Sequence, residues 1–200
     1  MEDLKFEKDK LKETIAAYQE VIKYYDERLE SIANMDNPRI KMKFMEMFNN
    51  KLKLIKNSLA KPYFARIDFK YQDSGKLEQC YIGKVGVTDE DNNIITVDWR
   101  APIASLYYDS HVGEASYEAP GGIFSGNLLI KRLFNIEKGI LESYQDVDTV
   151  ANDEMLKPYL GTNADKRLKN IVSTIQSEQN SIIRAKNSNN IIVQGVAGSG

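Results

Sequence analysis

The last ten residues of the chain carry its clearest chemical pattern. A short apolar run, IIVQ at residues 191–194, leads into a glycine-rich segment with the spacing G-x-x-G-x-G. A phosphate-binding P-loop, G-x-x-x-x-G-K-[ST], begins in this way, because its glycines let successive backbone N–H groups hold phosphate oxygens at the start of a helix. The predicted phosphate-binding residues are Gly195, Val196, Ala197, Gly198, Ser199 and Gly200.

The lysine and the Mg²⁺-binding Ser or Thr of that motif would come directly after Gly200. We therefore expect the chain to be a fragment cut inside the P-loop, with no catalytic residue of its own and no ATP hydrolysis. A glycine-rich linker would give a similar ending. We favour the P-loop because the apolar run before Gly195 is typical of a buried parallel strand.

A second candidate nucleotide contact is Gln179, which lies sixteen residues before Gly195 on an expected helix. A glutamine amide offers a donor and an acceptor side by side, and these match the N6/N7 edge of adenine. A solvated polar residue on a helix face is the simpler explanation of Gln179 alone. Together with the glycine-rich segment, we favour adenine recognition.

Composition limits the remaining chemistry. The 200 residues include 27 Lys and Arg against 29 Asp and Glu, a net charge of −2, so bulk electrostatics do not predict a nucleic-acid binder. The single cysteine, Cys80, and the single histidine, His111, exclude an internal disulfide, a cysteine zinc cage and a His-rich metal site. No apolar run approaches the ~20 residues that span a bilayer, and the first residues are charged. We expect a cytoplasmic protein that does not bind membranes.

The first third of the chain predicts an antiparallel helical hairpin. Apolar residues in 2–34 recur at alternating steps of three and four, the repeat of a coiled coil. The segment from Asn34 to Asn37 interrupts this repeat, and Pro38 suits the first turn of a second helix that continues to about Ala60. The charges agree, since residues 2–34 hold nine acids and six bases (−3), whereas residues 38–61 hold seven bases and one acid (+6).

After Pro62 the period of the pattern changes to two, which predicts strands. The expected strands are 63–71, 77–87, 94–99, 114–118, 127–136 and 140–146. They predict a small antiparallel sheet or partly closed barrel, and helical periodicity returns from Ala151. The predicted fold class is α+β, with a coiled-coil arm (1–61), an antiparallel β-rich domain (62–150) and the start of a RecA-like P-loop domain (151–200).

Two segments of the sheet region, IGKVGVTDED at 82–91 and VDWRAP at 97–102, resemble one family closely. The chain resembles the N-terminal part of the HelD-type proteins, the UvrD/Rep-like superfamily-1 helicases of bacteria that bind RNA polymerase. The order of elements is similar too, including a glutamine before the first P-loop strand. The resemblance implies a longer parent that binds ATP and Mg²⁺ and hydrolyses ATP. It also implies an arm that enters the secondary channel of RNA polymerase, so that stalled polymerase is released from DNA or RNA.

Several residues allow both a structural and a functional explanation. Asp98, Trp99 and Arg100 could form a partner or base-stacking contact, but we favour Trp99 as a core or interdomain anchor with Asp98 and Arg100 pinning the sheet. The arm would touch its partner near the hairpin tip, at Met35, Asp36 and Asn37. There Asp36 could act beside a catalytic Mg²⁺, although we favour a helix cap made by Asp36 or Asn37.

The basic second helix also remains open to two explanations. Its lysines could touch DNA or RNA, or they could complement the acidic first helix. The lysines concerned are Lys41, Lys43, Lys51, Lys53 and Lys56. Three function classes follow: a polymerase-releasing motor, which we favour, a DNA helicase without a polymerase role, and a non-enzymatic interaction module.

Overall fold

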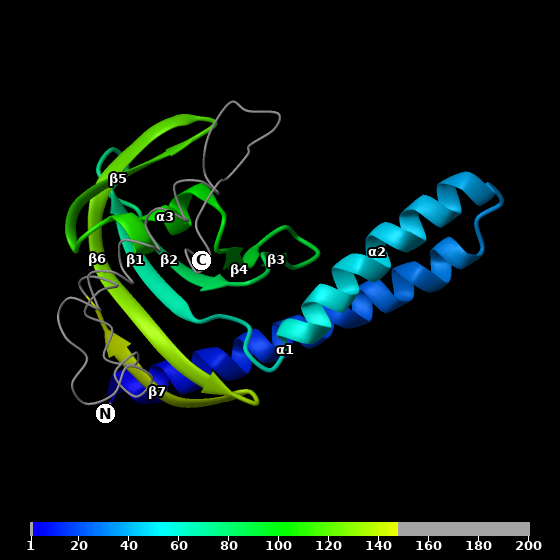
Figure 1. Cartoon of the computed structure of the whole chain (residues 1–200), viewed down its shortest axis with the longest axis horizontal. Helices are drawn as coiled ribbons and strands as arrows, with labels where there is room; N and C mark the ends of the chain where they lie inside the picture. Colours follow the sequence, from blue (N-terminus) through cyan, green and yellow to red (C-terminus); the bar gives the residue numbers. More distant parts are fainter. Residues whose placement is uncertain (1, 148–200) are drawn as a thin grey trace, which may run out of the picture. The chain divides into compact units, whose positions relative to one another are not determined.

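The computed structural model describes residues 2–147. It begins with two helices, α1 (Glu2–Ala33) and α2 (Pro38–Ser58), joined by a short turn (Figure 1). The helices run antiparallel, because contacts closer to the start of α1 involve residues further along α2. Lys41 donates to the Ala33 carbonyl, the Tyr25 ring lies 5.4 Å from that of Phe48, and Tyr18 packs with Ile55. The predicted pair of N-terminal helices is confirmed.

The turn between the helices is built by the residues that predict it. The Asn37 side chain accepts hydrogen bonds from the backbone N–H groups of Arg39 and Ile40, at 3.1 and 3.3 Å, and so caps α2. Pro38 occupies the first turn, where its missing N–H costs nothing. The cap is therefore made by Asn37, one of the two candidate residues.

Seven strands follow, and they pair in the order β3-β4-β2-β1-β6-β5, with β7 also paired to β6. Their bounds are β1 (Ala65–Tyr71), β2 (Leu77–Gly83), β3 (Val87–Thr88), β4 (Ile94–Asp98), β5 (Gly113–Ala119), β6 (Gly122–Glu137) and β7 (Ile140–Asp146). The α+β class is confirmed. The turn between β6 and β7 is the expected tight hairpin, with positive φ at Lys138 and Gly139.

The predicted antiparallel sheet is wrong in one respect, because the sheet is mixed. The ends of β2 and β4 pair in parallel, Ile82 with Val97 and Gly83 with Asp98. The short strand β3 folds back antiparallel onto β4, so β4 returns in the same direction as β2. Parallel strands usually need a crossover of a dozen or more residues; here residues 84–93, which include β3, make the connection.

The expected strand over 77–87 is also interrupted, and glycines mark the interruption. A side chain at Gly83 would run into the carbonyl oxygen of Pro62, and one at Gly86 would lie 3.3 Å from Asp98 Cβ. Both glycines of the IGKVG segment thus allow another part of the chain to approach the backbone closely. The chain leaves the ladder between them, so β2 and β3 are separate strands.

The contacts divide the chain into two compact units. The first comprises Met1–Arg66, Gln79–Trp99 and Arg132–Tyr144, and it contains both long helices. Its core has two clusters. In one, Leu11 of α1 packs with aromatic and aliphatic residues of the strands and of the segment before β1: Tyr63, Tyr81, Phe134, Ile136 and Leu141. In the other, Tyr18 and Val21 pack with Ile55 of α2 and Val87 of β3. The stripe of α1 that predicts a coiled coil therefore packs on strands along its first half.

Among the described residues, the second unit comprises Ile67–Glu78, Arg100–Lys131 and residues 145–147. It holds two short helices that the sequence pattern does not predict, η1 (Pro102–Ala104) and α3 (Ser105–Asp109). Pro102 occupies the first turn of η1, and Leu106 and Tyr107 of α3 are buried. Buried residues of β1 and β6 contribute to the same unit: Ile67, Phe69 and Leu128.

Candidate functional site

The base of the helical hairpin is held by a buried carboxylate. Glu7 of α1 has no solvent exposure. Its Oε1 accepts hydrogen bonds from Arg66 of β1 and Arg132 of β6, both through Nη1 at 2.7 Å, while its Oε2 accepts one from the Tyr81 hydroxyl of β2 at 3.0 Å. Short, charge-assisted bonds of this kind are stronger than neutral ones and fix the geometry of both partners. Three strands thereby hold one turn of α1.

Aromatic rings surround the two guanidinium groups. The Arg66 guanidinium lies 5.5 Å from the Phe6 ring and 5.6 Å from the Tyr81 ring, and that of Arg132 lies 4.2 Å from the Tyr144 ring. Burial raises the pKa of the Tyr81 hydroxyl, and the positive charge of Arg66 opposes part of this rise. Tyr81 therefore stays a neutral donor to Glu7.

A second buried contact lies further along α1. Tyr18 has no solvent exposure, and its hydroxyl lies 2.7 Å from the Thr96 hydroxyl of β4 and donates to the Pro62 carbonyl at 3.3 Å. Thr96 in turn donates to the Val85 carbonyl at 3.1 Å. Burial raises the pKa of Tyr18 as well. Glu7 and Tyr18, three turns apart, thus fix the direction of α1 within the first unit.

Beyond Tyr18 the two helices pack on each other and extend past the strands of their unit (Figure 1). The end of this hairpin is exposed at Met35, Asp36 and Asn37, the predicted contact residues. The structure brings these three together in one turn. We use the name helical arm for the two helices and this turn, residues 2–58.

The VDWRAP segment lies at the end of β4. The backbone N–H of Trp99 donates to the Gly83 carbonyl at 3.0 Å, which continues the pairing with β2. Trp99 and Asp98 are half-buried and Arg100 is exposed. Cys80 is buried in β2, and His111 is exposed in the segment before β5.

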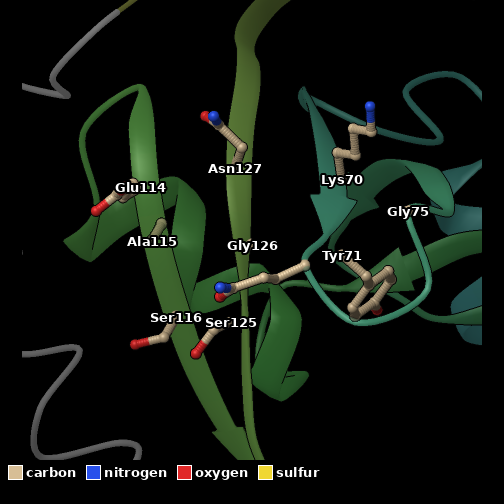
Figure 2. A pocket seen from close by; sticks show the side chains of 10 residues that line it. Lys70, Tyr71, Gly75, Glu114, Ala115, Ser116, Ser125, Gly126 and Asn127 are labelled. Atoms are coloured by element: carbon tan, nitrogen blue, oxygen red, sulfur yellow. The ribbon is translucent and has the colours of Figure 1, made fainter.

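The second unit carries a hollow of about 600 Å³ on the sheet formed by β1, β6 and β5 (Figure 2). Six polar side chains lie along it at alternate positions of the three strands or just beyond their ends: Lys70, Gln72, Glu114, Ser116, Ser125 and Asn127. Ser116 pairs with Ser125 and Glu114 with Asn127 across the ladder. The hollow offers hydrogen bonds and one charge of each sign, which is typical of the solvent face of an antiparallel sheet.

Within residues 2–147, no three His, Cys, Asp or Glu side chains gather as metal ligands. In that same part of the chain, no helix is both long and apolar enough to cross a membrane. The predicted nucleotide contacts, Gln179 and Gly195–Gly200, lie outside the described residues.

Sequence analysis missed the cluster around Glu7. A signal was present: Lys8 interrupts the coiled-coil stripe, while Glu7 stands three residues after Leu4 and four before Leu11, which is also helical spacing. Arg66 stands between Ala65 and Ile67, and Arg132 is followed by Leu133 and Phe134. Charged side chains at such positions are rarely buried without a partner. A buried glutamate and two buried arginines are therefore expected to pair.

A helical arm anchored by a buried ion cluster on a mixed sheet defines an α+β module without a recognisable catalytic constellation among its described residues. The family described as DNA helicase IV HelD, N-terminal domain, matches residues 4–157. Because this match covers most of the chain, the protein belongs to the HelD N-terminal domain family, whose description names a helicase. No curated protein matches the sequence.

The anchoring role of Glu7 predicts a large loss of stability on neutralisation. Glu7→Gln should lower the free energy of unfolding by about 3–5 kcal/mol, because two buried guanidinium groups lose the carboxylate that lies 2.7 Å from each, although Asp3 stays 3.8 Å from Arg132. Glu13→Gln on the same helix, whose side chain is 68% exposed, should change it by less than about 0.5 kcal/mol. Urea denaturation followed by circular dichroism measures both, and equal effects of the two substitutions would contradict the role of Glu7.

Tyr63 gives a pH-dependent prediction. Its hydroxyl is buried without a hydrogen-bond partner in the described part of the chain, and burial raises its pKa. Above pH 10 the unfolded chain releases this proton while the folded chain keeps it, so stability falls as pH rises, by about 1.4 kcal/mol per pH unit for each such tyrosine. Tyr63→Phe should match or exceed wild-type stability at pH 7 and lose less between pH 10 and 11. Identical alkaline profiles in denaturant titrations would exclude this explanation.

Proposed function

We propose that this chain is the partner-binding N-terminal region of an ATP-dependent superfamily-1 motor, and that its helical arm binds RNA polymerase and helps release it from nucleic acid. The observation that carries this proposal is the arm itself, which is fixed at its base by Glu7 and Tyr18 and exposed at its tip. Membership of the HelD family supports the motor as its context.

The dimensions of the arm suit a probe. With 32 residues in α1 and 21 in α2, the helices are about 48 and 31 Å long at 1.5 Å per residue. The part of α1 after Tyr18, which extends past the strands, is about 22 Å long. Two packed helices are narrow, about 20 Å across. A coiled-coil pair of this shape would fit into a channel of RNA polymerase and reach a site deep inside it. The buried anchor would transmit force between the tip and the remainder of the protein.

The ATP-hydrolysing motor is part of the proposal only, because its predicted residues lie outside the described part of the chain. Gly195–Gly200 would hold the phosphates of ATP through backbone N–H groups, and Gln179 would contact adenine. The residues after Gly200 would supply the lysine and the Mg²⁺ ligand of a RecA-like domain. A polymerase partner would place the protein in the cytoplasm.

Two other functions would give different experimental results. A DNA helicase would unwind duplexes without binding polymerase. A non-enzymatic interaction module would bind a protein partner, and its extended form would hydrolyse no ATP. The basic charge of α2 supports a role for DNA or RNA only if nucleic acid binds the isolated chain.

Shortening the arm tests the polymerase proposal. Leu11, Tyr18 and Ile55 belong to the core, so the cut must spare them: residues 27–46 are replaced by a short Gly-Asn loop, which keeps the Asp26–Lys56 ion pair. The shortened full-length protein should hydrolyse ATP at the wild-type rate but bind core RNA polymerase at least about tenfold more weakly. It should also fail to release stalled polymerase.

A companion variant is the full-length protein with Met35 and Asp36 both changed to Ser, which keeps the arm length and the Asn37 cap. Because these two residues are predicted contacts, it should also weaken polymerase binding while ATP hydrolysis stays at the wild-type rate. Normal polymerase binding and release by the shortened protein would show that the arm is only a structural brace. If the shortened protein loses ATP hydrolysis measured in the absence of polymerase, the arm instead supports the motor.

A second test concerns nucleotide. The 200-residue chain should not hydrolyse ATP, whereas a longer chain that includes the motor should. In the longer chain, Gln179→Ala should raise the KM for ATP more than that for GTP. The amide can donate to N7 and accept from N6 of adenine at once, whereas the same edge of guanine has two acceptors. Turnover by the 200-residue chain, or equal effects on both nucleotides, would contradict these assignments.

A further inference from the structure

The second helix of the arm carries two parallel apolar stripes, and only one of them packs on α1. The first stripe, at steps of three and four, faces α1 and includes Met45, Phe48, Leu52, Ile55 and Leu59. Of these, Leu52 and Ile55 are buried and the others are half-buried. The second stripe, at steps of four and three, comprises Ile40, Phe44, Met47, Lys51 and Leu54. We call this second set the open stripe.

The apolar members of the open stripe are unusually exposed. Ile40 is 45% exposed, Phe44 41%, Met47 53% and Leu54 52%. At about 100° per residue, the five positions fall within an arc of about 80°, centred about 100° from the stripe that packs on α1. A continuous heptad stripe of this kind is the seam of a helix–helix contact, and a row of exposed apolar residues on a domain marks an interaction site.

The surrounding charge indicates what would cover it. The sequence of α2 contains six basic residues and one acid, a charge of +5. Lys51 lies within the open stripe, with its ammonium group donating to the Gly86 carbonyl at 2.7 Å, and Lys43 lies beside it. Charged residues that flank an apolar seam select partners of opposite sign. The matching surface is therefore an amphipathic helix with apolar residues at heptad spacing and Asp or Glu on its flanks.

A second copy of the chain matches less well. Two α2 helices would bring a charge of +5 against +5. The acidic α1 helix has Phe6 as its single exposed large apolar residue among those described, so it offers no second seam. Nucleic acid would use the lysines, but phosphates would not cover Phe44, Met47 and Leu54.

We propose that the open stripe of α2 is a docking surface for an acidic amphipathic helix of a partner protein. The inference rests on the same arm as the proposed polymerase binding, and it names the surface and the partner chemistry rather than the tip. Docking of this kind would place a third helix along the arm and cover the four exposed apolar side chains of the open stripe. The affinity would fall as the salt concentration rises, because attraction between exposed opposite charges contributes part of the binding free energy.

The test uses the 200-residue chain and two synthetic helical peptides of the length of α2. Both carry leucines on a heptad stripe, which is flanked by glutamates in one peptide and by lysines in the other. Fluorescence anisotropy should show that the acidic peptide binds at least about tenfold more tightly than the basic one. The variant Met47→Gln/Leu54→Gln should weaken this binding about tenfold or more.

The matched control is Met42→Gln. Met42 is 72% exposed but lies roughly 120–180° around the helix from the stripe residues, so its loss should change affinity less than about twofold. Thermal melting checks that both variants remain folded, which is expected because all three side chains are largely exposed. Equal loss in variant and control, or equal affinity for the two peptides, would overturn the proposal.

Binding of core RNA polymerase separates this inference from the proposed function. If shortening the arm abolishes polymerase binding while Met47→Gln/Leu54→Gln leaves it and acidic-peptide binding intact, the open stripe is not the docking surface and the proposed function stands. If the shortened protein still binds polymerase but the acidic peptide depends on Met47 and Leu54, the inference stands alone.

A photo-crosslinker at position 47 identifies the occupant. Crosslinks to an acidic helix of the partner support the proposal. Crosslinks to residues 148–200 of the same chain, to a second copy, or to an added single-stranded DNA or RNA oligonucleotide would overturn it.

Discussion

One buried carboxylate determines how the helical arm is attached. Glu7 is enclosed by two guanidinium groups and a tyrosine hydroxyl that come from three different strands. Burying a carboxylate is costly unless its charge is neutralised and its oxygens are hydrogen-bonded, and burying the two guanidinium groups without it would be costly as well. The helix and the strands of the first unit can therefore reach their buried state only together.

The consequence of this anchor appears along the arm. Glu7 and Tyr18 hold the first half of α1 against strands, so that its second half and α2 must pack on each other beyond them. The glycines at 83 and 86 serve the same arrangement, since Gly83 leaves space for the carbonyl of Pro62, directly after the arm. The arm ends in an exposed turn, and α2 keeps a second apolar stripe exposed on its flank. The buried attachment and the two surfaces proposed for recognition thus occupy successive parts of one hairpin.

The sequence predicted those features that depend on local patterns. The two helices, the break at Asn34–Asn37 and most strand positions follow from periodicity and from turn residues. The parallel pairing of β2 and β4 did not follow, because two residue pairs at the strand ends decide it and alternation has no direction. The Glu7 cluster was missed because its members are 59 and 125 residues apart, and a charged residue on a helix ordinarily indicates solvent. The short helices after Pro102 have too few residues to show a period. The nucleotide-binding residues, Gln179 and Gly195–Gly200, remain predictions from sequence.

The central claim is that the arm is rigidly anchored and so can deliver its tip to a partner. Pulsed electron-spin resonance between labels at Asp36, in the tip, and Glu90, in the exposed turn before β4, measures this directly, since both residues belong to the first unit. The account predicts a single narrow distance distribution in the wild-type chain and a broad one after Glu7→Gln under conditions where the protein remains folded. A broad distribution in the wild type, or one that Glu7→Gln leaves unchanged, would contradict it.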